Sequence, residues 1–222
     1  MLYSFDFGIV LRFVPFLVQG IRYTLLVTVL ALAFGLVIGM AVAILRLTRI
    51  PFIGIPLSLY VDLFRSLPEL VFLFWMFYAV PILTGFHPSP VLSASLALGV
   101  SYGAGASEML RGGILSLSGG QWEAAFALGM STSQAYRRVI LPQAIVRMLP
   151  PLISSSISLI KASSLASAVG VTELMWQGNA LMLATYRRVE TYTVIAVVFF
   201  VCLLPLVQAT YALERRLGRS DA

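Results

Sequence analysis

Two uninterrupted apolar stretches, Tyr23–Leu45 and Thr191–Leu213, most constrain the structure of this chain. Each runs for 23 residues without an Asp, Glu, Lys or Arg. A hydrocarbon core about 30 Å thick needs roughly 20 apolar residues in a helix, and a backbone in lipid must satisfy its own hydrogen bonds. Only 11% of the 222 residues are charged, against about 25% in soluble proteins. The sequence therefore predicts an all-α polytopic membrane protein, with a single transmembrane domain over residues 1–222.

Five transmembrane helices are expected. They cover residues 23–45, 66–84, 91–110, 144–165 and 191–213. Two segments are predicted to lie outside the spans: residues 50–65, which two prolines interrupt, as an interfacial segment, and residues 166–190 as an outer connection. Residues 1–19 contain Asp6 and Arg12 and lack a basic start, which favours an amphipathic lead-in over a cleaved signal peptide.

Gly35 and Gly39 lie four residues apart within the first predicted span. This is the small-xxx-small spacing that lets two membrane helices approach closely. The spacing is equally compatible with two glycines that face lipid, and the sequence alone leaves both interpretations open.

The distribution of arginines predicts the orientation of the spans. An odd number of spans places the two chain ends on opposite sides of the membrane. With the N-terminus outside, ten arginines fall in the cytoplasm and four outside, as the positive-inside rule favours. The ten are Arg46, Arg49, Arg65, Arg111, Arg137, Arg138, Arg147, Arg215, Arg216 and Arg219, and the four are Arg12, Arg22, Arg187 and Arg188. The sequence thus predicts an N-out, C-in protein whose residues 118–142 are cytoplasmic.

Composition also excludes several classes of function. One histidine and one cysteine, His87 and Cys202, cannot form a disulfide framework and leave too few ligands for a Cys/His metal site. No G-x-x-x-x-G-K-[ST] phosphate loop occurs, so ATP hydrolysis by this chain itself is not expected. The net charge of +6 fits basic cytoplasmic loops better than nucleic-acid binding.

The polar segment 118–142 is predicted to form two short helices. Ser118 with Gln121, and Ser131 with Gln134, have the capping-box spacing that begins a helix. The glycine and the proline that follow these starts are expected to end the two helices. Gly129 can adopt the left-handed conformation, and Pro142 disfavours a helical residue before it.

This segment resembles the EAA loop of inner-membrane subunits of ABC importers. The pattern is EAA, three residues, G, nine residues and I-x-L-P, and the chain has valine at 139 for the usual isoleucine. The resemblance implies a coupling helix that docks on an ATP-binding subunit. The implied ATPase-coupling residues are Glu123, Ala124, Ala125, Gly129, Leu141 and Pro142. A solvated loop or a DNA-binding helix-turn-helix fits less well, because spans flank the segment and no second basic helix face is present.

Other segments resemble the polar amino-acid permease subunits of the same family. They are Phe64–Val71, Tyr102–Ile114, Gly120–Ala125 and Leu159–Leu165, with Glu173-Leu174 following at the family's spacing. The chain departs from the F-R-G-T-P-L-L-V pattern at Ser66, Leu67 and Glu69. It also has Ala162 where L-x-K-D-T-S-L has an acid. These departures leave an importer for a different small solute as the main alternative.

The resemblance implies a permease subunit of the bacterial cytoplasmic (inner) membrane that imports a polar amino acid. Its implied partners are two cytoplasmic ATPase subunits that hold ATP and Mg, a second permease subunit and an extracytoplasmic solute-binding protein. Two other classes fit poorly: a secondary transporter would need an internal repeat, and a membrane-embedded enzyme a clustered catalytic set. The sequence does not name the amino acid or distinguish a homodimer from a heterodimer.

Four residues are candidates for the substrate pathway: Lys161, Ser164, Glu108 and Glu173. An ionisable group in a span costs at least roughly 2.5–3.5 kcal/mol, so it usually faces a partner or a wet cavity. Lys161 is expected either to meet a carboxylate, such as that of a substrate, Glu108 or Glu173, or to extend to the outer interface. Glu108 is expected to pair with Arg111. Glu173 belongs either to a gate or docking surface or to a solvated loop.

Overall fold

The computed structural model describes residues 4–48, 50–117 and 119–217, and these residues form helices and connections without a β-strand. The all-α class predicted from the sequence is confirmed. The α-helices are α1 (Phe7–Leu11), α2 (Val14–Leu47), α3 (Pro51–Ser66), α4 (Glu69–Phe74), α5 (Val80–Thr84), α6 (Pro90–Leu115), α7 (Gly119–Ala127), α8 (Thr132–Ala135), α9 (Leu141–Ala162), α10 (Leu174–Thr185) and α11 (Arg188–Leu217). Two π-helical turns, Trp75–Ala79 and Tyr136–Ile140, join α4 to α5 and α8 to α9, and a 3₁₀ segment, Ser163–Val169, follows α9.

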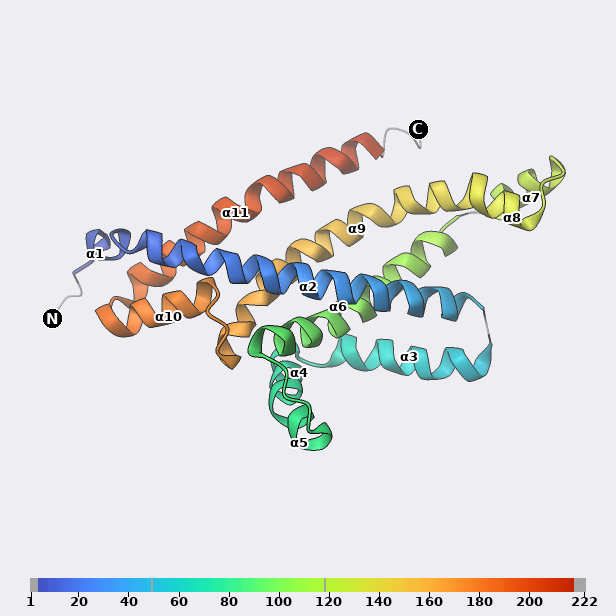
Figure 1. Cartoon of the computed structure of the whole chain (residues 1–222). Coiled ribbons are helices and arrows are strands. Elements are labelled where there is room, and N and C mark those ends of the chain that lie inside the picture. The colour runs from blue at the N-terminus through green and yellow to red at the C-terminus, as the bar shows by residue number, and fades with distance from the viewer. Residues whose placement is uncertain (1–3, 49, 118, 218–222) are drawn as a thin grey trace.

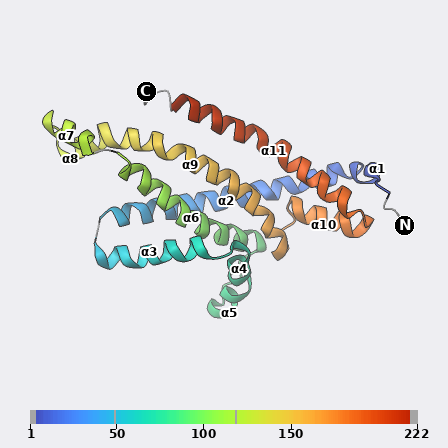
Figure 2. The same ribbon diagram turned by 180° about the vertical axis from the view of Figure 1, so that it is seen from behind.

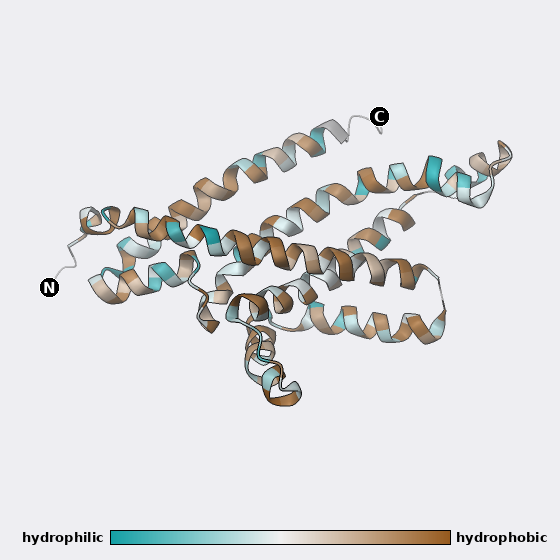
Figure 3. Ribbon diagram, in the orientation of Figure 1, coloured by the Kyte–Doolittle hydropathy of each residue, from teal (hydrophilic) through white to brown (hydrophobic). Residues whose placement is uncertain are grey.

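The long helices form an elongated bundle in which α6 lies between α2, α3 and α9 (Figures 1 and 2). The hairpin of α7 and α8 projects from one end of the bundle, and α1 and α10 lie at the other (Figure 1). Hydrophilic residues gather near the α8–α9 junction and in the first turns of α2, whereas the middle of α2 is hydrophobic (Figure 3). This distribution suits a bundle that crosses a membrane along its long axis.

The described helices differ in how clearly they qualify as membrane spans. Val14–Leu47, Thr132–Val169 and Arg188–Arg215 are each long and apolar enough to cross a membrane. Pro51–Ser66 and Glu69–Thr84 meet the same criterion only together, as a pair bent by 107°. The predicted span 91–110 falls in α6, which has 26 residues but buries many Ser, Gly and Ala side chains. Five crossings therefore remain a prediction.

Helices α2 and α6 pack closely through glycines. A Cβ on Gly35 would lie 2.8 Å from the carbonyl oxygen of Gly99, and one on Gly39 would lie 3.0 Å from that of Gly103. Without Cβ atoms, the two backbones come into direct contact, as small residues allow in membrane helices. Of the two interpretations of the Gly35/Gly39 spacing, close helix packing is confirmed and the lipid-facing alternative is wrong.

The segment predicted to be interfacial differs from that expectation. Helix α3 begins at Pro51 and runs beside α2 and α6, so it is part of the bundle (Figure 1). A proline in the first turn of a helix loses no internal hydrogen bond, which explains why Pro51 begins this helix. The chain instead turns at Leu67, whose extended backbone precedes Pro68. Helices α4 and α5 then project away from the bundle (Figure 1).

Pro142 does not end a helix, contrary to the sequence-based expectation. The helical chain runs without a break from Thr132 to Val169. The π-helical turn Tyr136–Ile140 immediately precedes Pro142, and a π turn changes the local hydrogen-bond register where a proline cannot donate. The predicted fourth span, residues 144–165, is therefore the middle of a longer helix.

The N-terminal segment is fixed against the start of α11. The guanidinium of Arg187 donates to the carbonyl oxygen of Ser4 at 2.6 Å, and the backbone N–H of Asp6 donates to the carboxylate of Glu190 at 3.0 Å. Glu190 is fully buried. These bonds hold Ser4 and Asp6 and the loop before α11 at the same end of the bundle.

Candidate functional site

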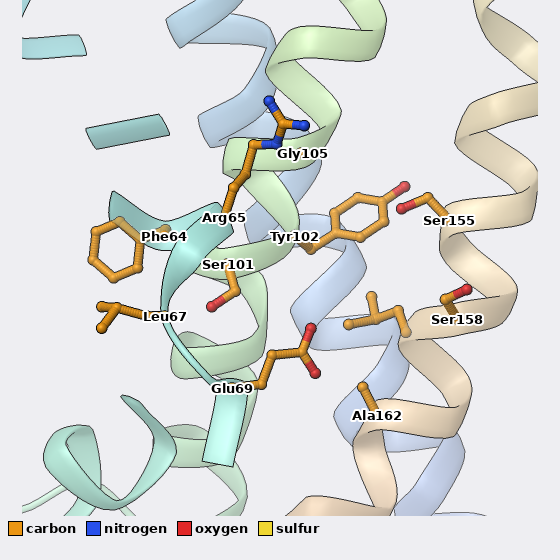
Figure 4. Close-up of a pocket in the computed structure, with 11 residues that line it drawn as sticks. Phe64, Arg65, Leu67, Glu69, Ser101, Tyr102, Gly105, Ser155, Ser158 and Ala162 are labelled. Carbon is orange, nitrogen blue, oxygen red and sulfur yellow. The ribbon is translucent and has the colours of Figure 1, made fainter. Parts of the chain in front are cut away.

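A central cavity of about 370 Å³ lies between the α3–α4 break, α6 and α9 (Figure 4). Its volume lies within the usual range for sites that bind small molecules. The lining consists of Phe64, Arg65, Leu67 and Glu69 around the break, Ser101, Tyr102 and Gly105 on α6, and Ser155, Ser158, Leu159 and Ala162 on α9. Irregular backbone at membrane depth is tolerated where it lines such a cavity, which makes the break a natural place for a ligand.

Arg65 and Glu69 are the two charged residues that line the central cavity. Arg65 belongs to the last turn of α3 and Glu69 to the first turn of α4, and both positions suit the helix dipoles. Within the part of the chain that the structure describes, neither side chain makes a hydrogen bond or an ion pair. Unpaired charges in a membrane bundle normally face water, a ligand or a partner chain.

Tyr102 holds the α6 and α9 walls of the cavity together. Its hydroxyl lies 3.0 Å from the hydroxyl of Ser156 and 3.4 Å from the carbonyl oxygen of Leu152, both on α9. The ring itself is nearly buried, at 7% exposure. A buried hydroxyl is costly without a hydrogen-bond partner. The contacts of the Tyr102 hydroxyl with α9 therefore hold the Tyr102 ring in place in the lining of the cavity.

Lys161 lies in a second cleft, about 180 Å³ in volume, between α9 and α11. Thr210 and Tyr211 of α11 form the opposite wall, and Ser158 lines both this cleft and the central cavity. Lys161 makes no ion pair with Glu108 or Glu173 among the described residues. The hydroxyl of Ser164 donates to the carbonyl oxygen of Lys161 at 2.8 Å, so these two residues are neighbours at the end of α9.

Glu108 forms ion pairs with two arginines. One partner is Arg111, at 2.9 Å on the same helix, and the other is Arg46 at the end of α2. The expected pairing with Arg111 is confirmed. The Arg46 contact joins residues 62 apart in the chain, and no local spacing in the sequence indicates it. Glu108 therefore connects α2 to α6 and lies apart from Lys161.

Glu173 is fully buried at the start of α10. Its carboxylate accepts hydrogen bonds from the backbone N–H groups of Met175, at 2.9 Å, and Trp176, at 2.8 Å. The backbone beside it packs against Gly20 of α2, where an added Cβ would lie 2.7 Å from the carbonyl carbon of Glu173. The segment is therefore packed, and the solvated-loop interpretation of Glu173 is wrong.

Burial also changes the ionisation of Glu173, which lies outside the predicted spans. Removal of the carboxyl from water raises its pKa from 4.5 to about 7, although the bonds from Met175 and Trp176 act in the opposite direction. A helix N-terminus stabilises a carboxylate, so the raised pKa means that desolvation is the larger effect here. Glu173 can thus change charge near neutral pH.

The α7–α8 hairpin has the local structure that its sequence predicts. The hydroxyl of Ser131 accepts from the N–H of Gln134 at 3.4 Å, and the side chain of Gln134 accepts from the N–H of Ser131 at 2.9 Å. Gly129 has a φ of +73°, so its left-handed conformation is confirmed. The first predicted capping box depends on Ser118, which lies outside the described residues.

The α7–α8 hairpin combines residues that pack against the bundle with exposed apolar residues. Ala125 is buried, and Trp122 packs against a core cluster that contains Ile140 and Ala144. Phe126, whose ring contacts that of Trp122, and Leu128 are 48% and 77% exposed. Of the residues predicted to couple to an ATPase, Glu123, Ala124, Gly129 and Pro142 are also exposed, and Leu141 is partly so. Exposed apolar residues next to a charge are typical of a protein-binding surface.

The chain belongs to the family of binding-protein-dependent transport system inner membrane components, which it matches over residues 35–219. It is 35% identical over 203 residues to the L-cystine transport system permease protein TcyL of Bacillus subtilis (strain 168), covering 89% of this chain and 85% of TcyL. It is 34% identical over 216 residues to the glutamine transport system permease protein GlnP of Escherichia coli (strain K12), covering 96% and 98%.

The fold has a close match among solved structures. The crystal structure of an amino acid ABC transporter with histidines contains a chain that is 32% identical, with a TM-score of 0.90. The match covers 96% of this chain and all of that one. The chain is therefore a transport component with a membrane-spanning helical fold.

The central cavity was not identified from the sequence, although the charged residues beside Leu67-Pro68 were a signal that could have located it.

Proposed function

We propose that this chain is the permease subunit of an ATP-driven ABC importer that carries a polar amino acid across the bacterial cytoplasmic membrane. The observation that carries the proposal is the agreement of relatives named for cystine and glutamine transport along nearly the whole chain. The solved neighbour, named as an amino acid transporter with histidines, supports the same substrate class. The central cavity has a suitable size and carries both signs of charge.

The α7–α8 hairpin would couple this subunit to a cytoplasmic ATPase. In this proposal Glu123 pairs with a basic group on the ATPase, and the small Ala124 lets the partner approach the backbone. The exposed Phe126 and Leu128 add apolar contact area. ATP and Mg belong to the ATPase, since this chain has no phosphate loop.

The complete importer would contain two permease subunits, two ATPase subunits and an extracytoplasmic solute-binding protein. The chain would cross the membrane five times, with its N-terminus outside and the α7–α8 hairpin in the cytoplasm. This proposed orientation places two of the described contacts on opposite sides of the membrane. Arg187 lies against Ser4 at the predicted outer end, and the Arg46–Glu108 pair lies at the predicted inner end.

Movement of the α7–α8 hairpins of the two permease subunits would change the side of the membrane to which the central cavity opens. Tyr102 and the serines of α9 would offer hydroxyl groups to the passing solute, while Arg65 and Glu69 would recognise its charges. Lys161 would act from the α9–α11 cleft, which shares Ser158 with the cavity, and Ser164 would act beside it through its bond to the Lys161 carbonyl oxygen. Glu108 and Glu173 would hold the ends of α2 in place when the cavity opens to the cytoplasm and when it opens to the outside.

Reconstitution tests the proposal directly. The chain is co-purified with its ATPase and second permease subunit, inserted into liposomes, and supplied with the solute-binding protein. Uptake of radiolabelled L-cystine, L-glutamine or L-histidine that requires ATP inside the liposomes is the expected result. Absence of ATP-dependent uptake for every amino acid offered, from a complex that hydrolyses ATP, would overturn it.

A further inference from the structure

Two positions at which the sequence departs from its family pattern line the same cavity. The pattern has leucine at position 69 and an acid at position 162, whereas this chain has Glu69 and Ala162. Both residues line the central cavity. In Figure 4 the carboxylate of Glu69 points toward the α9 wall on which Ala162 lies. The cavity therefore keeps one carboxylate, supplied by α4 instead of α9.

The surroundings of Glu69 leave this carboxylate available to a ligand. Arg65 is the other charged residue of the lining, and its guanidinium points away from Glu69 toward Gly105 (Figure 4). The remaining polar groups near Glu69 are hydroxyls, such as those of Ser101 and Ser158. In the described part of the chain, no hydrogen bond or ion pair satisfies the Glu69 carboxylate.

We infer that Glu69 binds the positively charged nitrogen of the transported amino acid and excludes amino acids with a second carboxylate. This inference rests on the proposed function and adds a selectivity rule to it. Glu69 is exposed in the single chain, so a ligand can reach its carboxylate. At a given distance, opposite charges attract and like charges repel to the same degree. A zwitterion such as glutamine offers Glu69 an ammonium group. Glutamate offers the same ammonium group with an additional negative charge.

A competition experiment on the assembled importer tests this rule. Permease and ATPase subunits in lipid nanodiscs, without the solute-binding protein, are titrated with radiolabelled L-glutamine against unlabelled L-glutamate. The two amino acids are nearly equal in shape and differ in charge, so the ratio of their affinities reports selection by charge. We expect glutamate to bind at least ten times more weakly than glutamine to the unaltered complex, and the ratio to fall toward one in Glu69→Gln.

The double variant Glu69→Gln/Ala162→Asp provides a reciprocal test. It returns a carboxylate to the α9 wall, so the preference for glutamine should reappear. A preference that is unchanged in Glu69→Gln, or that the double variant does not restore, would overturn the inference. Glu69 could instead pair with the second permease subunit. Loss of the two-permease assembly in Glu69→Gln, measured by light scattering, would also overturn it.

The failure of this inference can be distinguished from the failure of the proposed function. ATP-dependent amino-acid uptake by the complete importer, combined with no effect of Glu69→Gln on the affinity ratio, rejects only the role of Glu69. Absence of uptake for every amino acid offered rejects the proposed function itself.

Discussion

Gly35 of α2 and Gly99 of α6 lie so close that a methyl group on Gly35 would come within 2.8 Å of the Gly99 carbonyl oxygen. The same added atom would lie 2.6 Å from the ring of Tyr102. Tyr102, which lines the central cavity, in turn bonds to Ser156 of α9. This close contact between α2 and α6 thus supports a residue that lines the cavity.

Substitution of Gly35 is expected to destabilise the protein. The Gly35→Ala variant must separate α2 from α6 or displace Tyr102, and overpacking of this kind typically costs about 1–3 kcal/mol. The measurement is the apparent melting temperature of the detergent-solubilised complex. Gly112→Ala is the matched control, because an added Cβ there meets nothing within 4 Å. Equal melting temperatures for the two variants would contradict the prediction.

A side chain at position 129 is expected to separate the permease from its ATPase. The φ of +73° at Gly129 places a residue with a Cβ in a conformation that costs about 1–2 kcal/mol. The Gly129→Val variant should therefore alter the angle between α7 and α8 and lower ATPase co-purification at least several-fold. Glu123→Lys, which reverses an exposed charge, should have the same effect. Gly112→Val serves as control, and full co-purification of both hairpin variants would count against the coupling role.

The stability of the protein is expected to fall as pH rises through the range in which Glu173 ionises. The pKa is about 7 when the protein is folded and 4.5 as a reference for the unfolded chain. Between these values the folded state binds more protons, so the stabilisation present below about pH 4.5 is lost by about pH 7. A shift of this size corresponds to roughly 3 kcal/mol.

The Glu173→Gln variant removes the ionisation and keeps one oxygen, which can accept from the N–H of either Met175 or Trp176 but not from both as the two carboxylate oxygens do. The lost capping bond lowers stability at every pH, whereas the ionisation changes it with pH. The melting temperature of the unaltered protein should fall relative to that of the variant between pH 5 and pH 8. A difference in melting temperature that stays constant across this pH range would indicate an effect on helix capping alone. It would refute the predicted ionisation of Glu173.

Removal of the Lys161 charge is expected to reduce uptake strongly while insertion and assembly continue. Lys161 lines a cleft without a carboxylate partner among the described residues, and such a cation in a bundle usually serves a ligand or a partner chain. ATP-dependent uptake in proteoliposomes should fall at least tenfold in Lys161→Ala and be largely kept in Lys161→Arg. Normal uptake by Lys161→Ala would show that the side chain only extends to the interface.

Local patterns in the sequence predicted local structure well. The capping box of Ser131 and Gln134, the left-handed Gly129 and the Glu108–Arg111 pair each depend on residues a few positions apart, and each is present. The small-xxx-small spacing of Gly35 and Gly39 was compatible with a close contact but did not establish it or identify the partner helix. The partner is set by tertiary packing, which a pattern within one helix does not contain.

The features that the sequence missed depend on neighbours distant in the chain. Pro142 was expected to end a helix, because a proline disfavours a helical residue before it. The structure instead has a π-helical turn, Tyr136–Ile140, directly before Pro142, and the helix continues. The two prolines of residues 50–65 suggested an interface, whereas α3 packs beside α2 and α6. The central cavity combines residues from α3, α4, α6 and α9. Glu69 and Ala162 appeared in the sequence as unrelated departures, and only the fold brings them to one site.

The uninterrupted helical run from Thr132 to Val169 has a mechanical consequence. At 1.5 Å per residue, about 45 Å separate Thr132, where the run begins beside α7, from Ala162 in the wall of the central cavity. No loop lies between them to absorb a displacement. The run contains Pro150, Pro151 and a π-helical turn, which are positions where a helix can bend. It nevertheless joins the base of the α7–α8 hairpin to the wall of the solute cavity, so a displacement of the hairpin reaches that wall through one continuous helical segment.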